Sequence, residues 1–168
     1  MIIAIYLALF VFYLLVIIFI LYSFYAFIKG APFVPMNKNN VRSMLELVKP
    51  QPTEILMDLG SGDGRILYLA SKYKCKCIGI EINPLLYYWS KLKLRRIKNI
   101  EVRRENLWKT DLKNIDILTL FFIPPKMDRL HKKILAEMKL NSRVVSYGFK
   151  FPDWHFSEKS GNIYLYKV

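Results

Sequence analysis

The stretch ILMDLGSGDGRI, residues 55–66, carries three glycines at alternate positions directly after a short apolar run that ends in an acid. Gly60, Gly62 and Gly64 can take backbone conformations that residues with a Cβ avoid, so backbone amides in this loop can approach a ligand closely. A helical pattern follows the loop, and a strand–loop–helix turn of this kind is where α/β sheets bind their ligands. We therefore expect a cofactor at this loop.

The G-S-G-D-G spacing differs from that of two phosphate-binding motifs. It lacks the second intervening residue of the dinucleotide fingerprint G-x-G-x-x-G, and it contains no G-K-[ST] for a nucleoside triphosphate. Asp58 stands two residues before the first glycine, where its charge would repel a pyrophosphate and attract an ammonium group. We expect a ligand with a positively charged amino-acid end.

Glu81 ends the next apolar run, in GIEINP. A carboxylate at the end of the second strand of a nucleotide-binding sheet can accept hydrogen bonds from ribose hydroxyls. A ribose joined to a cationic amino-acid end describes S-adenosylmethionine. The alternative is a simple glycine turn with an unrelated surface Glu81, but strand, loop, helix, strand and acid occur together in order.

Strand patterns alternate with helix patterns along the chain, which is typical of a doubly wound parallel sheet. The pattern predicts an α/β, Rossmann-like fold whose mostly parallel seven-stranded sheet ends in an antiparallel hairpin. We expect strands at 55–57, 77–81, 100–104, 115–123 and 143–149, helices at 65–72, 84–97 and 127–138, and a hairpin that turns at Ser160 and Gly161.

Residues 2–28 contain no Asp, Glu, Lys or Arg, and the run exceeds the roughly 20 residues that a helix needs to cross a bilayer. We interpret residues 1–28 as a transmembrane helix. A cleaved signal peptide would want a basic start and a shorter apolar core. A helix of the soluble core is the other alternative, but so long an uncharged run would be polar on no face at all. A linker and lead-in helix at 29–50 and a cofactor-binding domain at 51–168 complete the chain.

The formal net charge of +13 belongs entirely to residues 29–168. Lys29, Lys38 and Arg42 follow the apolar helix closely, and this asymmetry predicts a single-pass membrane protein with a cytoplasmic carboxyl-terminal domain. Such a charge suits an anionic membrane surface, nucleic acid or an acidic protein partner. We interpret the basic run KLKLRRIK as a solvated face that could turn to anionic headgroups.

Five segments carry a resemblance to a known family: APFVPMNKNNVRSMLELV, DLGSGDGRI, GIEINPLL, RVVSYGFKFPDW and IYLY. Together they resemble the small archaeal protein-lysine methyltransferases and the membrane-anchored mitochondrial enzymes that methylate lysines of the ATP-synthase c-ring and the adenine nucleotide translocase. These are class I S-adenosylmethionine-dependent methyltransferases, and the likeness covers residues 31–168. It implies a membrane-anchored protein-lysine N-methyltransferase that acts on a protein with an accessible lysine.

The resemblance also implies where the cofactor lies. The methionine end would lie at Asp58, Gly60, Ser61, Gly62 and Gly64. The ribose and adenine would lie at Glu81, Ile82, Asn83, Glu105, Asn106 and Leu107, with Phe121 at the same edge of the sheet. Asn106 departs from the Asp that is commoner in the superfamily at the adenine contact.

A lysine amine must lose its proton before it can accept a methyl group. Desolvation in an apolar slot lowers the pKa of the amine, so no strong base is required. The slot is expected from the segments before the domain and after the fourth strand. Its members would be Phe33, Val34, Pro35, Phe121, Phe122, Ile123 and Pro124, with Phe33, Pro35, Phe122 and Pro124 as the candidates to touch the substrate.

Other motifs are weaker. FFIPP is similar to the D/N-P-P-Y/F motif of methyltransferases that act on nucleic-acid bases, but Ile123 and Lys126 replace its polar and aromatic members, so a nucleic-acid substrate is disfavoured. His131 and His155 each stand alone and are assigned to the surface or to packing. Two alternatives stay open: a methyltransferase for a membrane lipid, quinone or small molecule, and a non-catalytic S-adenosylmethionine-binding module.

Cys75 and Cys77 alternate with lysines in KCKC and should point to one face of a strand. Without a second cysteine pair or a histidine cluster they make a poor metal site, so we expect buried, reduced thiols and no bound metal.

Overall fold

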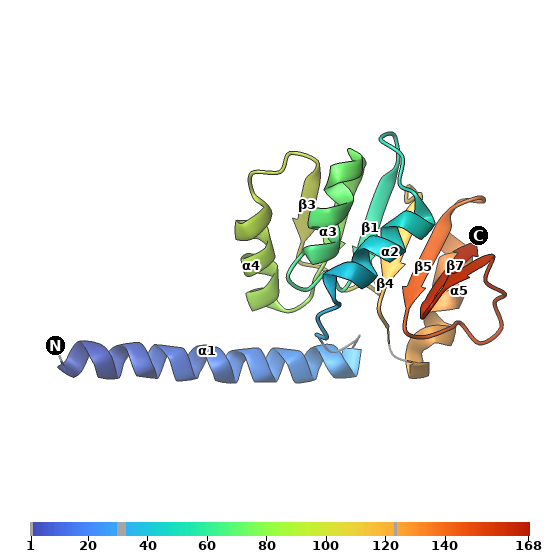
Figure 1. Ribbon diagram of the computed structural model, residues 1–168. Helices are drawn as coiled ribbons and strands as arrows, with labels where there is room; N and C mark the ends of the chain where they lie inside the picture. Colours follow the sequence, from blue (N-terminus) through green and yellow to red (C-terminus); the bar gives the residue numbers. More distant parts are fainter. Residues whose placement is uncertain (1, 30–32, 123) are drawn as a thin grey trace.

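The computed structural model describes residues 2–29, 33–122 and 124–168 and has a seven-stranded sheet at its centre (Figure 1). The strand order is β3-β2-β1-β4-β5-β7-β6. The first five strands in this order are parallel, and β7 runs antiparallel to both β5 and β6. The expected Rossmann-like sheet with a closing antiparallel hairpin is confirmed. The strands are β1 (Ile55–Leu59), β2 (Lys76–Ile80), β3 (Ile100–Arg103), β4 (Ile117–Leu120), β5 (Arg143–Tyr147), β6 (Glu158–Ser160) and β7 (Ile163–Lys167).

Helices cover both faces of this sheet, because its central strands are apolar on both sides. Leu56 of β1 packs in the same core cluster as residues of α2 and α3, whereas Met57 packs in the cluster that holds residues of α5. Figure 1 shows α2 and α3 in front of the sheet and α4 beside β3. The helices are α1 (Ile2–Lys29), α2 (Lys38–Val48), α3 (Arg65–Ala70), α4 (Pro84–Leu94) and α5 (Met127–Glu137), with short 3₁₀ turns η1 (Ser71–Tyr73) and η2 (Pro124–Lys126).

Four of the five parallel strands differ in length from the sequence expectation, and two of them, β1 and β4, bear on the site. β1 continues past Met57, and Asp58 lies inside it, opposite Gly79 of β2 and Thr119 of β4. The expected strand at 115–123 shortens to β4, which ends at Leu120. Both strands end where the strands that they pair with end. The hydropathy pattern alone does not define where this pairing stops.

Helix α1 is the longest element and extends away from the domain. An 18-residue window within Ile2–Tyr25 has a mean hydropathy of 3.1, and the helix is long and apolar enough to cross a membrane. In Figure 1 it runs below the edge of the sheet at which the parallel strands end. The lead-in helix α2 follows, and its N-cap is Asn37, whose side chain accepts a hydrogen bond from the Asn39 amide at 2.9 Å.

The outer edge of the sheet on the β6 side is short and polar. All three residues of β6 are exposed, and two of them, Glu158 and Lys159, are charged. Short charged edge strands are a common protection against pairing with another sheet.

Candidate functional site

The glycine loop lies at the carboxyl end of β1 and is tied to β2. The amides of Gly60 and Ser61 both donate to the carbonyl of Ile80, each at 2.9 Å. Gly60 has φ +83° and Gly62 has φ +54°, in the left-handed region that favours glycine. The loop is thus an open turn of backbone at the centre of the sheet's ligand-binding edge.

Glu81 fixes this turn from the neighbouring strand. Its carboxylate accepts one hydrogen bond from the Gly62 amide and one from the Asn83 amide, both at 2.8 Å. The side chain is buried, and burial raises the pKa of Glu81, while these backbone hydrogen bonds oppose the rise. The two amides orient both carboxylate oxygens, and each oxygen keeps a lone pair for a further donor.

Asp58 is the second buried carboxyl of the site. The Thr119 hydroxyl donates to its Oδ1 at 2.9 Å. The pKa of Asp58 is raised to about 7, mainly by burial; the hydrogen bond from Thr119 opposes the rise, and the nearby charges of Glu81 and Asp63 add to it. A buried carboxyl with this pKa gains from a cationic partner, because ionisation without one is costly.

A cleft of about 940 Å³, including its open mouth, lies against these residues. It brings together segments that are far apart in the sequence: the residues before α2, the glycine loop, and the ends of β2, β3 and β4. Of the predicted site residues, those that line it are Phe33, Val34, Pro35, Asp58, Gly60, Ser61, Gly62, Glu81, Ile82, Asn83, Glu105, Asn106, Leu107, Phe121 and Phe122.

Two predicted residues have other positions. Gly64 is the N-cap of α3, and a Cβ there would lie 2.5 Å from the Leu94 side chain, so its small size serves helix packing. Pro124 is exposed in η2 and is not among the residues that line the cleft. Ile123 lies outside the described residues, as do residues 30–32 of the linker.

Buried polar atoms in the cleft are left for a ligand. Ser61 Oγ, Asn83 Nδ2 and Ser23 Oγ have no hydrogen-bond partner among the described residues, and all three residues line the cleft. An unpaired buried polar atom costs free energy. These atoms, the two carboxyls and the open loop suit a ligand that carries a cationic end and a polyhydroxyl sugar.

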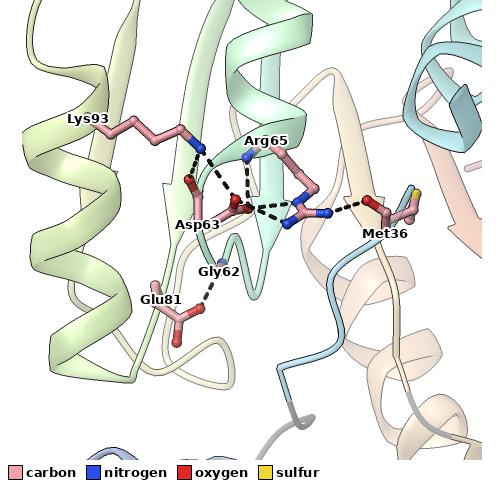
Figure 2. Close-up of polar contacts among 6 residues, drawn as sticks. All are labelled: Met36, Gly62, Asp63, Arg65, Glu81 and Lys93. Carbon is pink, nitrogen blue, oxygen red and sulfur yellow. Dashed lines mark hydrogen bonds and ion pairs between the residues drawn. The ribbon is translucent and has the colours of Figure 1, made fainter. Parts of the chain in front are cut away.

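An ion-pair network behind the loop was not expected from the sequence. Figure 2 shows the Asp63 carboxylate between Arg65, whose Nε is 2.8 Å from Oδ1, and Lys93, whose Nζ is 3.3 Å from Oδ2. Arg65 also donates to the carbonyl of Met36. These partners lower the pKa of Asp63, although partial burial alone would raise it. The network fastens the segment that precedes α2 to the glycine loop.

The fastened segment places Phe33 against the loop. A Cβ added to Gly62 would lie 2.6 Å from the Phe33 ring, so the ring occupies the space that the missing side chain leaves. We expected Gly62 to be small only for the sake of the ligand. The Phe33 ring also requires that residue 62 carry no side chain.

Aromatic rings at the ends of β4 and β5 form a second group that sequence reasoning found only in part. Phe121 packs edge-on against Tyr147 at 5.2 Å between ring centroids and stacks with Phe149 at 6.3 Å. Gly148, at φ +84°, lets the Phe121 ring approach the backbone. Phe122 is buried and packs edge-on against Trp108 at 5.8 Å. The adjacency of β4 and β5 brings these rings together, and only the order of strands could have revealed it.

The two histidines and the two cysteines do not line the cleft. His131 stacks on Trp154 at 4.7 Å, and partial burial lowers its pKa; neither His131 nor the exposed His155 lines the cleft. Cys75 and Cys77 are buried free thiols with their sulfurs 3.6 Å apart. Within the described ranges no group of three or more His, Cys, Asp or Glu could hold a metal.

Comparisons with known proteins agree on one family. Residues 58–158 match the ANTKMT methyltransferase domain. The chain is 32% identical over 126 residues to the ATP-synthase c-ring lysine N-methyltransferase of Xenopus laevis, covering 73% of this chain and 55% of that protein. It is 30% identical over 163 residues to a protein-lysine N-methyltransferase of Saccharolobus islandicus, covering 85% of this chain and 97% of that protein.

A solved structure shows the same architecture. An RNA methyltransferase from Salinibacter ruber in complex with S-adenosyl-L-homocysteine matches with a TM-score of 0.78 and 28% identity, covering 80% of this chain and 94% of that one. The chain spans about half the length of the vertebrate ATP-synthase c-ring lysine methyltransferases that it matches.

Proposed function

This chain belongs to the ANTKMT methyltransferase domain family, and from that premise we propose that it transfers methyl groups from S-adenosylmethionine to lysine side chains of a protein. The observation that carries the proposal is the pair of buried carboxyls, Asp58 and Glu81, on either side of the glycine loop. The lysine acceptor is supported by the activity named for the relatives from Xenopus laevis and Saccharolobus islandicus.

The residues of the cleft fit this cofactor. Asp58 would attract the ammonium of its methionine end, and Glu81, already oriented by two amides, would accept hydrogen bonds from its ribose hydroxyls. Asn83 Nδ2 and Ser61 Oγ supply buried partners for its polar atoms. When bound, the cofactor supplies a methyl group on a positively charged sulfur, which a neutral amine can take up.

The acceptor amine would enter between the aromatic residues at the mouth of the cleft. Phe33 and Phe121 line the cleft, and Tyr147 and Phe149 pack against Phe121. An apolar aromatic surrounding disfavours the charged lysine, so its proton is lost to solvent as the side chain enters. We assign these residues to desolvation and alignment of the amine, and we assign no general base.

We further propose that α1 anchors the protein in a membrane with the domain on the cytoplasmic side. The support for the anchor is the apolar length of Ile2–Tyr25. The support for the orientation is that Lys38 and Arg42 follow the helix closely, as positive charges do at the cytoplasmic end of a membrane helix. An enzyme held in this way would reach lysines close to the membrane surface.

Transfer from radiolabelled S-adenosylmethionine to a cell membrane fraction tests the proposal. With the full chain in detergent, we expect label in protein and methyl-lysine after acid hydrolysis. Glu81→Gln should abolish the labelling, while Glu158→Gln, the same change at an exposed edge position, should not.

Each alternative gives a different result in this assay. Label in the lipid extract would point to a lipid or quinone acceptor, and label in RNA would match the activity named for the Salinibacter ruber neighbour. Cofactor binding without transfer to any fraction would indicate a non-catalytic module. Any of these results would overturn the lysine assignment.

A further inference from the structure

Helix α4 carries an outward face that its own fold does not use. Its buried residues, Leu86, Ser90 and Leu94, repeat every four positions and pack inward. Tyr88, Trp89 and Leu92 are 60%, 63% and 59% exposed. Three large apolar side chains gathered on one exposed helix face are unusual for a domain surface in water.

The helix and the turn that follows it are strongly basic. From Pro84 to Lys98 the chain has five lysines and arginines and no acid. Lys93 pairs with Asp63, and Lys91 donates to the Tyr87 hydroxyl. The structure gives Arg95 and Arg96, both exposed, no ion pair with any residue that it describes. Exposed cations beside aromatic and aliphatic side chains form the usual composition of a helix that lies in a membrane interface.

The position of α1 places α4 beside the expected bilayer. Near its carboxyl end, Tyr22 and Tyr25 share a pocket with Ile82 and Arg104 of the domain. Figure 1 shows the rest of α1 projecting past the side of the domain that carries α4. A bilayer that holds the amino-terminal part of α1 therefore lies next to α4.

We propose that the outer face of α4, with Tyr88, Trp89 and Leu92 among Lys91, Arg95 and Arg96, docks on an anionic lipid surface. Tyrosine and tryptophan rings favour the level of the headgroups. Each cation near an anionic surface is worth about a factor of five in the docking equilibrium, from about 1 kcal/mol each. The surface would hold the cleft at a fixed height and angle above the membrane. This inference rests on the proposed anchoring by α1, but it needs no methyl transfer.

Quenching of Trp89 by lipids with a spin label near the headgroup tests the docking. The full chain is reconstituted in vesicles of neutral phosphatidylcholine, with or without anionic phosphatidylglycerol, and Trp89→Phe isolates the signal of Trp89 from the two other tryptophans. We expect quenching in the anionic vesicles and much less in the neutral ones.

Two variants that lose the same number of positive charges, one at the proposed docking face and one away from it, give the matched comparison. The variant Lys91→Gln, Arg95→Gln, Arg96→Gln should lose the quenching. The variant Lys132→Gln, Lys159→Gln, Lys167→Gln, which removes the same charge from α5 and the opposite edge of the sheet, should keep it. Equal quenching in both lipids, no quenching at all, or equal loss in both variants would overturn the proposal. Flotation with the vesicles checks anchoring separately, and cofactor binding by calorimetry checks the proposed function separately.

Discussion

At the scale of single residues, the two buried carboxyls have similar burial but different surroundings. Glu81 receives two backbone amides, which stabilise its charge. Within the part of the chain that the structure describes, the Asp58 side chain accepts a hydrogen bond from the Thr119 hydroxyl alone, and burial is the main cause that raises its pKa to about 7. Glu81 is therefore oriented before a ligand arrives, whereas Asp58 gains most of its charge stabilisation from the ligand. A cation at Asp58 would be bound most strongly when this carboxyl is ionised.

Cofactor affinity should consequently depend on pH. As the pH falls through about 7, Asp58 takes up a proton, and affinity for S-adenosylmethionine should fall by about tenfold for each further pH unit. Calorimetry with the full chain in detergent between pH 5.5 and about 8 would measure this slope. A flat profile would show that Asp58 does not face the cationic end of the ligand.

Asp58→Asn should raise the stability of the fold above pH 7 and weaken cofactor binding. A carboxyl whose pKa is raised in the folded state contributes stability that is present below its unfolded pKa and is lost as the pH rises through about 7. The variant should thus unfold at higher temperature than the parent above pH 7, by an amount corresponding to about 1–4 kcal/mol, and the gain should vanish near pH 4. It should bind the cofactor poorly at every pH. A lower melting temperature at pH 8 would contradict this account of Asp58.

Gly62→Ala should damage the site beyond the cost of its backbone conformation. Gly62 and Gly161 have nearly the same φ, +54° and +55°, but only at Gly62 does an added Cβ meet a side chain, that of Phe33. Both alanine variants should lose about 1–2 kcal/mol of stability through left-handed strain. Only Gly62→Ala should displace Phe33 and weaken cofactor binding by about tenfold or more. In a Phe33→Ala background, Gly62→Ala should cost only as much stability as Gly161→Ala costs, and a larger cost there would exclude the ring as the cause.

At the scale of elements, local patterns in the sequence predict the features that neighbouring residues determine, such as strands and turns. Apolar runs located all five parallel strands, and GSGDG with Glu81 located the cleft. Arg65 was missed because its reach to Met36 crosses 29 positions of the chain, which no periodicity records. Tyr147 and Phe149 were missed for a related reason, since their place beside Phe121 follows from β5 lying next to β4. Pro124 was predicted at the slot because the fourth strand was expected to run to 123, and the earlier end of β4 leaves it exposed in η2.

The segment before α2 should loosen when Arg65 is neutralised. Arg65→Gln removes the pair with Asp63 and weakens the bond to the Met36 carbonyl; because the side chain is partly exposed, the loss of stability should be only about 1 kcal/mol. Cleavage by chymotrypsin after Phe33 should become faster, and S-adenosylmethionine should protect less. Arg42→Gln, which loses a single exposed hydrogen bond to Asn39, is the control. Equal cleavage of both variants would mean that Arg65 does not hold the segment.

At the scale of the whole molecule, the chain combines a bare apolar helix with a basic domain whose ligand-binding edge lies beside that helix. The charge and the apolar run could be read from the sequence. The side of the domain that α1 approaches could not, because it depends on how Leu21, Tyr22 and Tyr25 meet residues at the ends of β2 and β3.

Membrane anchoring by α1 should fail when charges are placed in its middle. Phe10→Arg, Leu14→Arg and Ile17→Arg together should cost about 8–10 kcal/mol at the centre of a bilayer and should release the protein into the soluble fraction on carbonate extraction. The control has arginines at three exposed positions of the domain, Tyr68, Leu135 and Leu140, and it should remain in the membrane fraction. Retention of both variants would rule out α1 as the anchor.

The short charged strand β6 matters more for a tethered protein than for a free one. Copies anchored in one membrane would diffuse in two dimensions, so an open strand edge would meet other copies at a higher local density than in solution. Because Glu158 and Lys159 occupy that edge, neighbouring copies meet charge where a backbone ladder could otherwise continue. On the proposed anchoring by α1, this charged edge would keep crowded copies from joining their sheets into aggregates.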